Sequence, residues 1–261
     1  MIAGSAESIA ALAVIFFVIA LFTVVIGSTS LITIPIMLQF GMEPRTAVAT
    51  NMFALALLSA GGALPFARTP AMDRQRMPLL VALTLAGSAI GALLLFAVPA
   101  KWMSLVIPVA MIVVLVLLLA EPGSGSLTET PPSPARSNAG YAIMTLLAIY
   151  GGFLSGGYAT LIAATGMLFF HYPFIRGMAM SKVLNLASSL VAVAVFAWYQ
   201  VVDWPLGVIL GLAAFAGGFM GARWARNMPA KLLRHLFVIA VTALAAKSLI
   251  FDVPWRELLA I

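Results

Sequence analysis

The sequence predicts an all-α integral membrane protein built as an inverted repeat of two five-segment halves, with roughly eight to ten transmembrane helices. Two observations predict the class. Of the 261 residues, 63% are hydrophobic and 8% are charged, and the apolar residues gather in runs of membrane-spanning length. A third observation predicts the repeat, because the order of long and short runs occurs twice. With so few charges the chain could not cover a water-facing surface, which excludes a soluble enzyme, a nucleic-acid-binding protein and a disordered protein.

The first half, residues 1–120, contains five apolar segments. They are predicted at 9–26, 31–40, 46–66, 79–98 and 103–120. The second segment is too short to cross a bilayer by itself and contains Pro35, so it is expected to be a short or broken helix. Glu7 is the only charged residue before the first run, which indicates a retained span and not a cleaved signal peptide.

A change of composition separates the halves. Residues 121–139 are rich in Pro, Gly, Ser and Thr, which predicts an extramembrane linker. The second half, residues 140–261, repeats the order of the first, with segments predicted at 141–155, 161–170, 177–198, 206–222 and 232–251. Its second segment is again the short one.

A shift of 130 residues tests whether this order reflects a duplication. The shift superposes Gly27 on Gly157, Gly87 on Gly217, Gly91 on Gly221, and Pro99-Ala100-Lys101 on Pro229-Ala230-Lys231. Apolar matches would arise by chance in such a sequence, but Gly, Pro and Lys matches held at one spacing indicate a true repeat.

Basic residues predict the orientation of each half. In the first half they follow the third segment, at Arg68, Arg74 and Arg76. In the second half they follow the fourth segment, at Arg223, Arg226, Lys231 and Arg234. Because basic loops face the cytoplasm, the halves are expected to lie in opposite orientations, with the linker inside and both termini outside. This requires an odd number of crossings per half, so each short segment counts as one arm of a broken helix.

Inverted repeats are typical of secondary transporters, and the matching short segments point to the substrate site. The predicted substrate-binding residues are Gly27, Ser28, Thr29, Ser30, Thr50 and Asn51 in the first half, with Gly157, Tyr158, Thr160, Ser181, Lys182 and Asn185 in the second. A broken helix exposes backbone N–H groups that attract anions, hydroxyls and amides add donors, and Lys182 adds a full positive charge. No carboxylate falls in the middle of a predicted span, so an anionic substrate is expected, with no catalytic residue, metal or cofactor.

Other interpretations of these residues and of the fold stay open. Ser and Thr side chains in membrane helices often bond to their own backbone, and Lys182 could extend to the lipid headgroups. An anion channel of the same fold is the first rival function. A non-transporting membrane subunit is another, whereas an intramembrane enzyme is disfavoured because the chain has no Cys and no clustered His.

Two runs carry a resemblance to a known family. The run from Gly27 to Leu55, GSTSLITIPIMLQFGMEPRTAVATNMFAL, resembles the first signature of the sulfite exporter TauE/SafE family. The run from Gly156 through Ser181-Lys182 to Leu186 resembles its duplicate. Consecutive glycines are frequent at both breaks in the family, where this chain has Ser28-Thr29-Ser30 and Tyr158-Ala159-Thr160.

The resemblance implies a multi-pass permease of the cytoplasmic (inner) membrane that moves small sulfur oxyanions, such as sulfite or an organosulfonate, usually outward. It places the binding positions at the two breaks, the Thr-Asn pair and the Ser-Lys pair. The expected partners are this anionic substrate and the lipid bilayer, with no nucleic acid; assembly into a homo-oligomer is left open.

Overall fold

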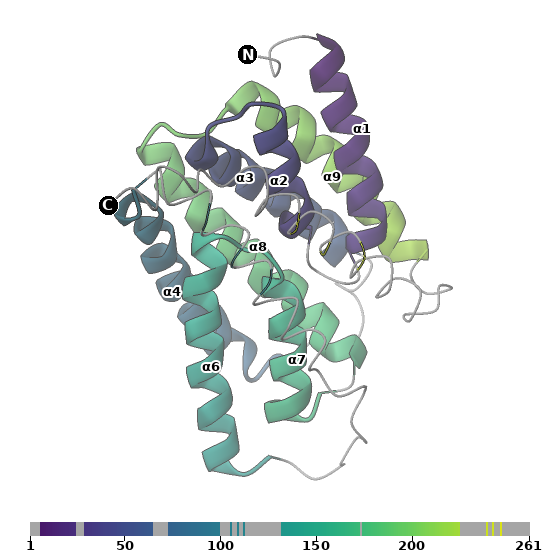
Figure 1. The fold of residues 1–261 in the computed structure, drawn as a ribbon. Helices are drawn as coiled ribbons and strands as arrows, with labels where there is room; N and C mark the ends of the chain where they lie inside the picture. The colour runs from purple at the N-terminus through teal and green to yellow at the C-terminus, as the bar shows by residue number, and fades with distance from the viewer. Residues whose placement is uncertain are drawn as a thin grey trace.

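The computed structural model describes residues 6–24, 29–64, 73–99, 132–172 and 174–224, with single helical positions at 105, 109, 112, 239, 242 and 246. All regular secondary structure in these residues is α-helical (Figure 1). Three predictions therefore lie wholly or mostly outside the described residues: the fifth segment of each half, most of the linker, and the site residues Gly27 and Ser28.

Eight helices are described, and they match the predicted order. They are α1 (Ala6–Thr23), α2 (Ser30–Gln39), α3 (Pro44–Ala63), α4 (Met77–Ala97), α6 (Pro134–Phe153), α7 (Tyr158–Phe170), α8 (Phe174–Trp198) and α9 (Trp204–Trp224). The helices α1, α3, α4 and α9 and residues Ala179–Trp198 of α8 are long and apolar enough to cross a membrane. The two short apolar helices are α2 and α7, as the sequence predicts. The all-α membrane class is confirmed.

Local sequence explains where α3 and α6 begin. Glu43 accepts a hydrogen bond from the backbone N of Thr46 at 2.8 Å, and Pro44 follows it in the first turn. Ser133 accepts one from the backbone N of Arg136 at 3.3 Å, and Pro134 follows in the same way. Helix α6 therefore takes in residues 134–139, which the prediction assigned to the linker.

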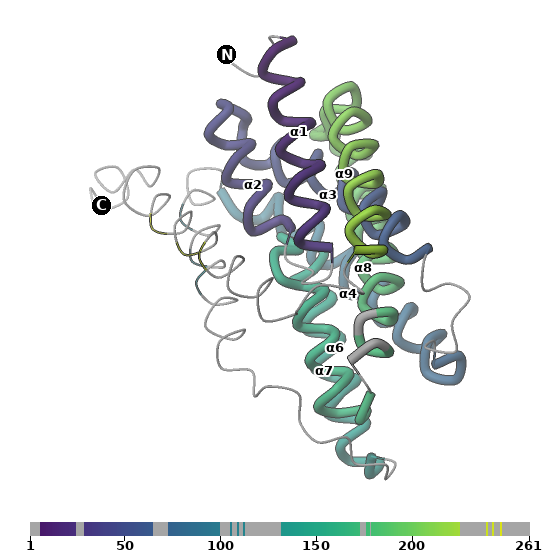
Figure 2. The backbone as a smooth tube through the Cα atoms, turned by 90° about the vertical axis from the view of Figure 1, so that its right-hand side faces the viewer, coloured from purple at the N-terminus to yellow at the C-terminus, as the bar shows by residue number. Residues whose placement is uncertain are grey.

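The helices form two groups that mix the sequence halves. The first packing unit contains α1, α2, α3 and α9, and the second contains α6, α7, α8 and α4 (Figures 1 and 2). In the first unit α9 packs on α1 and α3, and in the second α4 packs on α6 and α8. Exchanging each helix for its counterpart in the other half converts the contacts of α9 with α1 and α3 into those of α4 with α6 and α8. The contact between α6 and α8 has no counterpart of similar extent between α1 and α3.

Matching glycines make the same close contacts in both units. A Cβ on Gly91 of α4 would overlap the carbonyl oxygen of Ile149 in α6, and one on Gly221 of α9 would overlap that of Leu21 in α1. One turn earlier, a Cβ on Gly87 would lie 2.8 Å from the Cβ of Ala148, and one on Gly217 would lie 2.9 Å from that of Ala20. Glycine at these four positions allows the helices to pack closely.

The directions of the helices agree with this reciprocity. In Figure 1, α1 runs downward from the N-terminus, whereas its counterpart α6 runs upward from the end of the linker. Opposite directions and exchanged contacts are what an inverted repeat would produce. The orientation of each half in a membrane stays a prediction.

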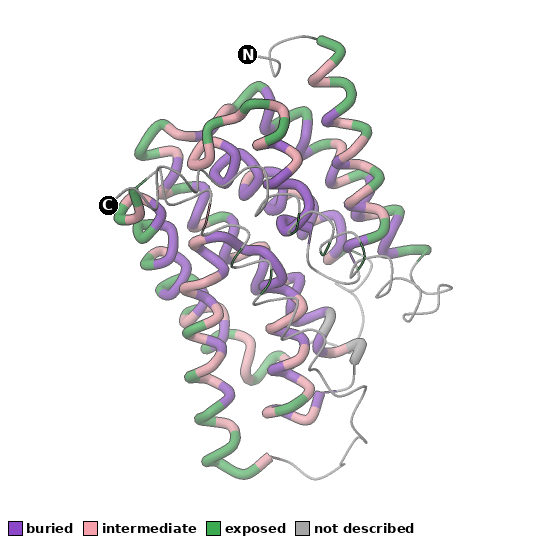
Figure 3. The backbone as a smooth tube through the Cα atoms, viewed as in Figure 1, coloured by how far each residue is buried: buried purple, intermediate pink, exposed green. Residues whose placement is uncertain are grey.

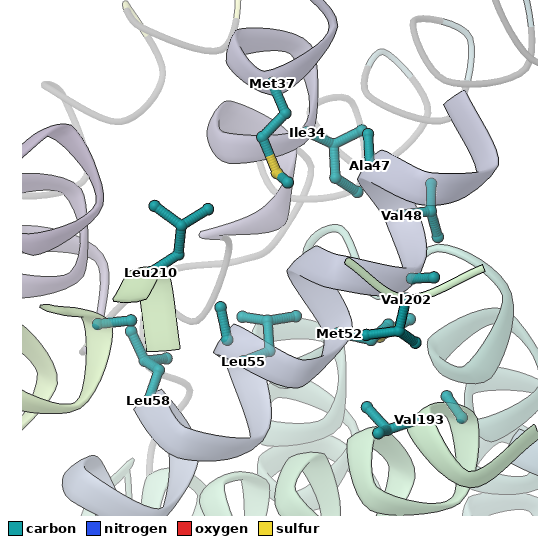
Figure 4. Packing of buried hydrophobic residues seen from close by; sticks show 14 of the residues in the cluster. Ile34, Met37, Ala47, Val48, Met52, Leu55, Leu58, Val193, Val202 and Leu210 are labelled. Atoms are coloured by element: carbon teal, nitrogen blue, oxygen red, sulfur yellow. The ribbon is translucent and has the colours of Figure 1, made fainter. Parts of the chain in front are cut away.

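Buried residues lie within and between the units (Figure 3), and most of them are apolar. One cluster centres on α2 and α3, where Ile34, Met37, Val48 and Met52 are buried, and it continues onto α8 at Val193 (Figure 4). A smaller cluster belongs to the second unit alone. It is formed by Leu80, Met144, Tyr158, Ile162, Phe170, Tyr172, Met180 and Leu184.

Candidate functional site

The break before α7 is a reversal of the chain between two antiparallel helices. Ser155 and Gly157 have φ angles of +59° and +75°, in the left-handed region that favours glycine. The hydroxyl of Tyr150 in α6 donates a hydrogen bond to the carbonyl of Gly156 at 2.5 Å and so fixes this turn. Helix α7 then returns beside α6, as α2 returns beside α1 (Figures 1 and 2).

Asn51 of α3 organises the start of α2. Its Nδ2 donates to the hydroxyl of Ser30 at 3.0 Å, and its Oδ1 accepts a hydrogen bond from the hydroxyl of Thr33 at 2.6 Å. Just before this helix, the hydroxyl of Thr29 lies 2.6 Å from that of Thr23 in α1. All five side chains are buried. The predicted residues Thr29, Ser30 and Asn51 therefore lie together.

Asn185 of α8 contacts the second break. Its Nδ2 donates to the hydroxyl of Ser59 in α3 at 2.7 Å, and its Oδ1 accepts a hydrogen bond from Ser155 at 3.4 Å. The amide thus connects the turn before α7 to α3. Ser181, which comes one turn earlier in α8, is also buried.

Lys182 lies between these two networks in α8. Only 1% of its surface is exposed, which does not fit the alternative that it extends to the headgroups. Its Cδ and Cε lie 3.6 and 3.9 Å from the point where a Cβ on Gly62 of α3 would be. The Cγ2 of Val24, at the end of α1, lies 2.8 Å from that same point. The lysine therefore extends from the second packing unit toward α3 and the end of α1 in the first.

Carboxylates are placed at helix beginnings throughout the described residues. Glu7 is in the first turn of α1, Glu43 caps α3, Asp73 precedes α4 and Asp203 precedes α9. Asp73 forms an ion pair with Arg76 at 3.7 Å, whereas Lys182 forms none within the described ranges. No described carboxylate therefore compensates the charge of Lys182.

Two predicted residues make contacts elsewhere. The hydroxyl of Thr50 accepts a hydrogen bond from the backbone N of Asp203 at 3.0 Å, at the beginning of α9. Tyr158 is fully buried with its ring against Gly151 of α6. Its hydroxyl is directed toward Thr84 and Ser188 but forms no complete hydrogen bond within the described part of the chain. Thr160 is half-buried on α7.

Four network residues were not among the predicted site residues: Thr23, Thr33, Ser59 and Ser155. Ser59 follows Asn51 by eight positions, about two helical turns, so a search for polar residues on one face of α3 could have found it. Ser155 precedes the glycine pair of the second break. Thr23 depends on how α1 and α2 pack, which sequence spacing does not give.

A second polar cluster lies outside the spans, between the loop before α4 and the end of α7. The hydroxyl of Tyr172 donates a hydrogen bond to the Asp73 carboxylate. Burial alone would raise the pKa of Asp73, but this bond, the backbone N–H groups of Arg76 and Gln75 and the Arg76 guanidinium together hold it below its usual value. Burial, followed by the hydrogen bond to Asp73, raises the pKa of Tyr172, so its hydroxyl keeps its proton.

The family model described as "Sulfite exporter TauE/SafE" matches residues 12–248. The chain belongs to the sulfite exporter TauE/SafE family. The resemblance seen in the two polar runs is thereby confirmed over most of the chain, and so is the expectation of a multi-pass integral membrane protein.

Curated relatives in this family carry transporter names. The "Probable membrane transporter protein ORF9" of Sinorhizobium sp is 26% identical over 224 residues, which cover 85% of each chain. The "Probable membrane transporter protein YfcA" of Escherichia coli K12 is 27% identical over 253 residues, covering 95% of this chain and 93% of the relative. A "Probable membrane transporter protein" of Haemophilus influenzae is also 27% identical, covering 94% and 96%. No solved structure matches the chain. These names are those of transporters, not enzymes, and this TauE/SafE protein is a membrane transporter.

Proposed function

We propose that this TauE/SafE protein is a secondary transporter that moves a small oxyanion, such as sulfite or an organosulfonate, across the cytoplasmic membrane by alternating access. The observation that carries the proposal is the burial of Lys182 beside α3 and Val24 at the end of α1, with no carboxylate paired to it in the described residues. An unpaired charge inside a membrane protein costs at least about 2.5–3.5 kcal/mol, so its retention favours a function that supplies a counter-ion.

The groups around the lysine suit an anion. The N-terminal ends of α2 and α7 carry backbone N–H groups that no helical carbonyl accepts, and helix N-termini attract negative charge. Each amide nitrogen of Asn51 and Asn185 has two hydrogens and uses one of them in the contacts described above. Among the described residues no acceptor takes the second hydrogen of each, and we assign it to a substrate oxygen.

The substrate class follows from this set of donors. A small tetrahedral or pyramidal oxyanion presents several acceptor oxygens around one centre, and short donors from three or four helices can surround it. Ser30, Asn51, Lys182 and Asn185 are the side chains proposed to do so. Thr50 and Tyr158 are assigned structural contacts here, with Asp203 and with α6 respectively.

The test is flux in proteoliposomes. The protein should take up sulfite in a saturable manner with counterflow. Lys182→Met should abolish the flux, because it keeps most of the aliphatic chain but removes the charge. Ser188→Ala, a buried polar substitution on the same helix, is the matched control and should transport normally. Normal flux through Lys182→Met would refute the assigned site, and single-channel currents would indicate a channel.

A further inference from the structure

Alternating access requires rigid bodies, and the packing of the helices indicates which ones they are. We propose that the moving bodies are the two packing units, α1-α2-α3-α9 and α4-α6-α7-α8, and not the two sequence halves. The proposal rests on the proposed transport function. It differs from a rocking of one half against the other because α4 and α9 each move with the opposite half.

Each exchanged helix is joined to its unit along its length. The backbone of α4 approaches α6 so closely that a Cβ on Gly91 or on Gly152 would overlap a carbonyl oxygen of the partner helix. The hydroxyl of Ser88 in α4 lies 2.7 Å from that of Ser188 in α8. Helices in backbone contact cannot slide without steric overlap, so α4 is expected to move with α6 and α8.

At the beginning of each exchanged helix a hydrogen bond connects the helix to its own unit, through different groups in the two units. Asp73, before α4, accepts from Tyr172 at the end of α7. Asp203, before α9, donates its backbone N–H to Thr50 in α3 at 3.0 Å. The two aspartates are 130 positions apart, which is the spacing of the repeat. Both bonds cross the sequence halves, but neither crosses the packing units.

The units contact each other mainly through one pair of helices. Among the described helices, α3 with α8 is the only pair that packs extensively across the boundary. This seam carries the bond from Asn185 to Ser59 and the passage of Lys182 beside Gly62. The candidate substrate site therefore lies where the units meet, and a relative motion of the units would open it to one side or the other.

Disulfide cross-linking can separate the two descriptions, because the wild-type chain has no Cys. Ser88→Cys with Ser188→Cys would link the sequence halves inside the second packing unit, and their hydroxyl separation of 2.7 Å suits a disulfide. Leu31→Cys with Gly156→Cys would link the two units, because the Cγ of Leu31 lies 3.0 Å from the Cβ position of residue 156. Each single variant serves as the control for its pair.

Sulfite flux is measured with each pair oxidised and then reduced. We expect the oxidised Ser88–Ser188 pair to keep flux within about twofold of its reduced form, and the oxidised Leu31–Gly156 pair to lose at least tenfold and recover on reduction. Reversible loss in the first pair, or undiminished flux in the second, would overturn the proposal.

A second measurement does not depend on sulfite. Spin labels at Val14→Cys in α1 and Leu146→Cys in α6 measure a distance between the two units. Labels at Ile90→Cys in α4 and Leu146→Cys measure a distance within the second unit. All three native side chains are exposed. The first distance should be distributed over two populations in liposomes and the second over one. One population for the distance between the units and two for the distance within the second unit would contradict the proposal. Absence of sulfite flux in the reduced cysteine pairs would count against the proposed transport function alone.

Discussion

Asn185→Asp tests the charge balance of the candidate site with little change of shape. Asn185 follows Lys182 by three positions on α8, and residues three apart on a helix have Cβ atoms about 5–6 Å apart. A carboxylate at 185 would attract the ammonium of Lys182 and repel an anionic substrate. Two unit charges about 6 Å apart at an effective dielectric constant of about 20 interact by about 3 kcal/mol. That energy corresponds to roughly a hundredfold weaker binding of the anion.

The assay is the concentration dependence of sulfite uptake in proteoliposomes, with Asn185→Ala as the control. Alanine removes the hydrogen bonds to Ser59 and Ser155 without adding charge, and leaving those hydroxyls unpaired costs about 1–3 kcal/mol of stability. The aspartate variant should therefore show the larger loss of apparent affinity, and the alanine variant the larger loss of thermal stability. If the aspartate variant bound sulfite as well as the alanine variant does, the reasoning about Lys182 would be refuted.

Three further predictions concern the fold. Gly91→Ala should destabilise the protein by about 1–3 kcal/mol, because its Cβ would overlap the Ile149 carbonyl. It should lower the Tm more than the control Gly207→Ala, whose Cβ would meet the Phe53 ring at 3.2 Å. Equal Tm values for the two variants would contradict the close α4–α6 contact. Thr50→Val should lower the Tm, because it removes the acceptor of the Asp203 N–H. The apparent affinity for sulfite should stay unchanged. A weaker affinity would indicate that Thr50 binds the substrate. Because the folded pKa of Asp73 is lowered, its ionised form stabilises the protein above the unfolded pKa of about 3.9, and this contribution is lost as the pH falls through the folded value. Asp73→Asn should therefore be less stable than wild type at pH 7, with a difference that narrows below about pH 4; a difference independent of pH would argue against the carboxylate.

Much of the fold could be predicted because the sequence states it through composition and spacing. Long apolar runs predicted α3, α4 and α9 to within a few residues, since a bilayer demands both length and low charge. The start of α6 was missed because prolines and serines before residue 140 resemble a linker. A Ser-Pro pair is also a helix-start signal, and Ser133 and Pro134 use it that way.

The packing of the helices is the part that sequence could not supply. The 130-residue repeat identifies α4 and α9 as counterparts but does not say that each packs against the opposite half. In the same way, spacing marked Asn51 and Asn185 as candidates, yet their partners Ser30 and Ser59 are decided by which faces of the helices meet. Side-chain hydrogen bonds of this kind depend on the three-dimensional arrangement and on no local pattern.

The most direct test of the central claim is calorimetric titration of the purified protein with sulfite, sulfate, an organosulfonate and a carboxylate. If Lys182 and the two chain breaks hold an oxyanion, the protein should bind sulfite or the sulfonate at one site, and Lys182→Met should lose that binding while remaining folded. Undiminished binding in the Lys182→Met variant would contradict the account.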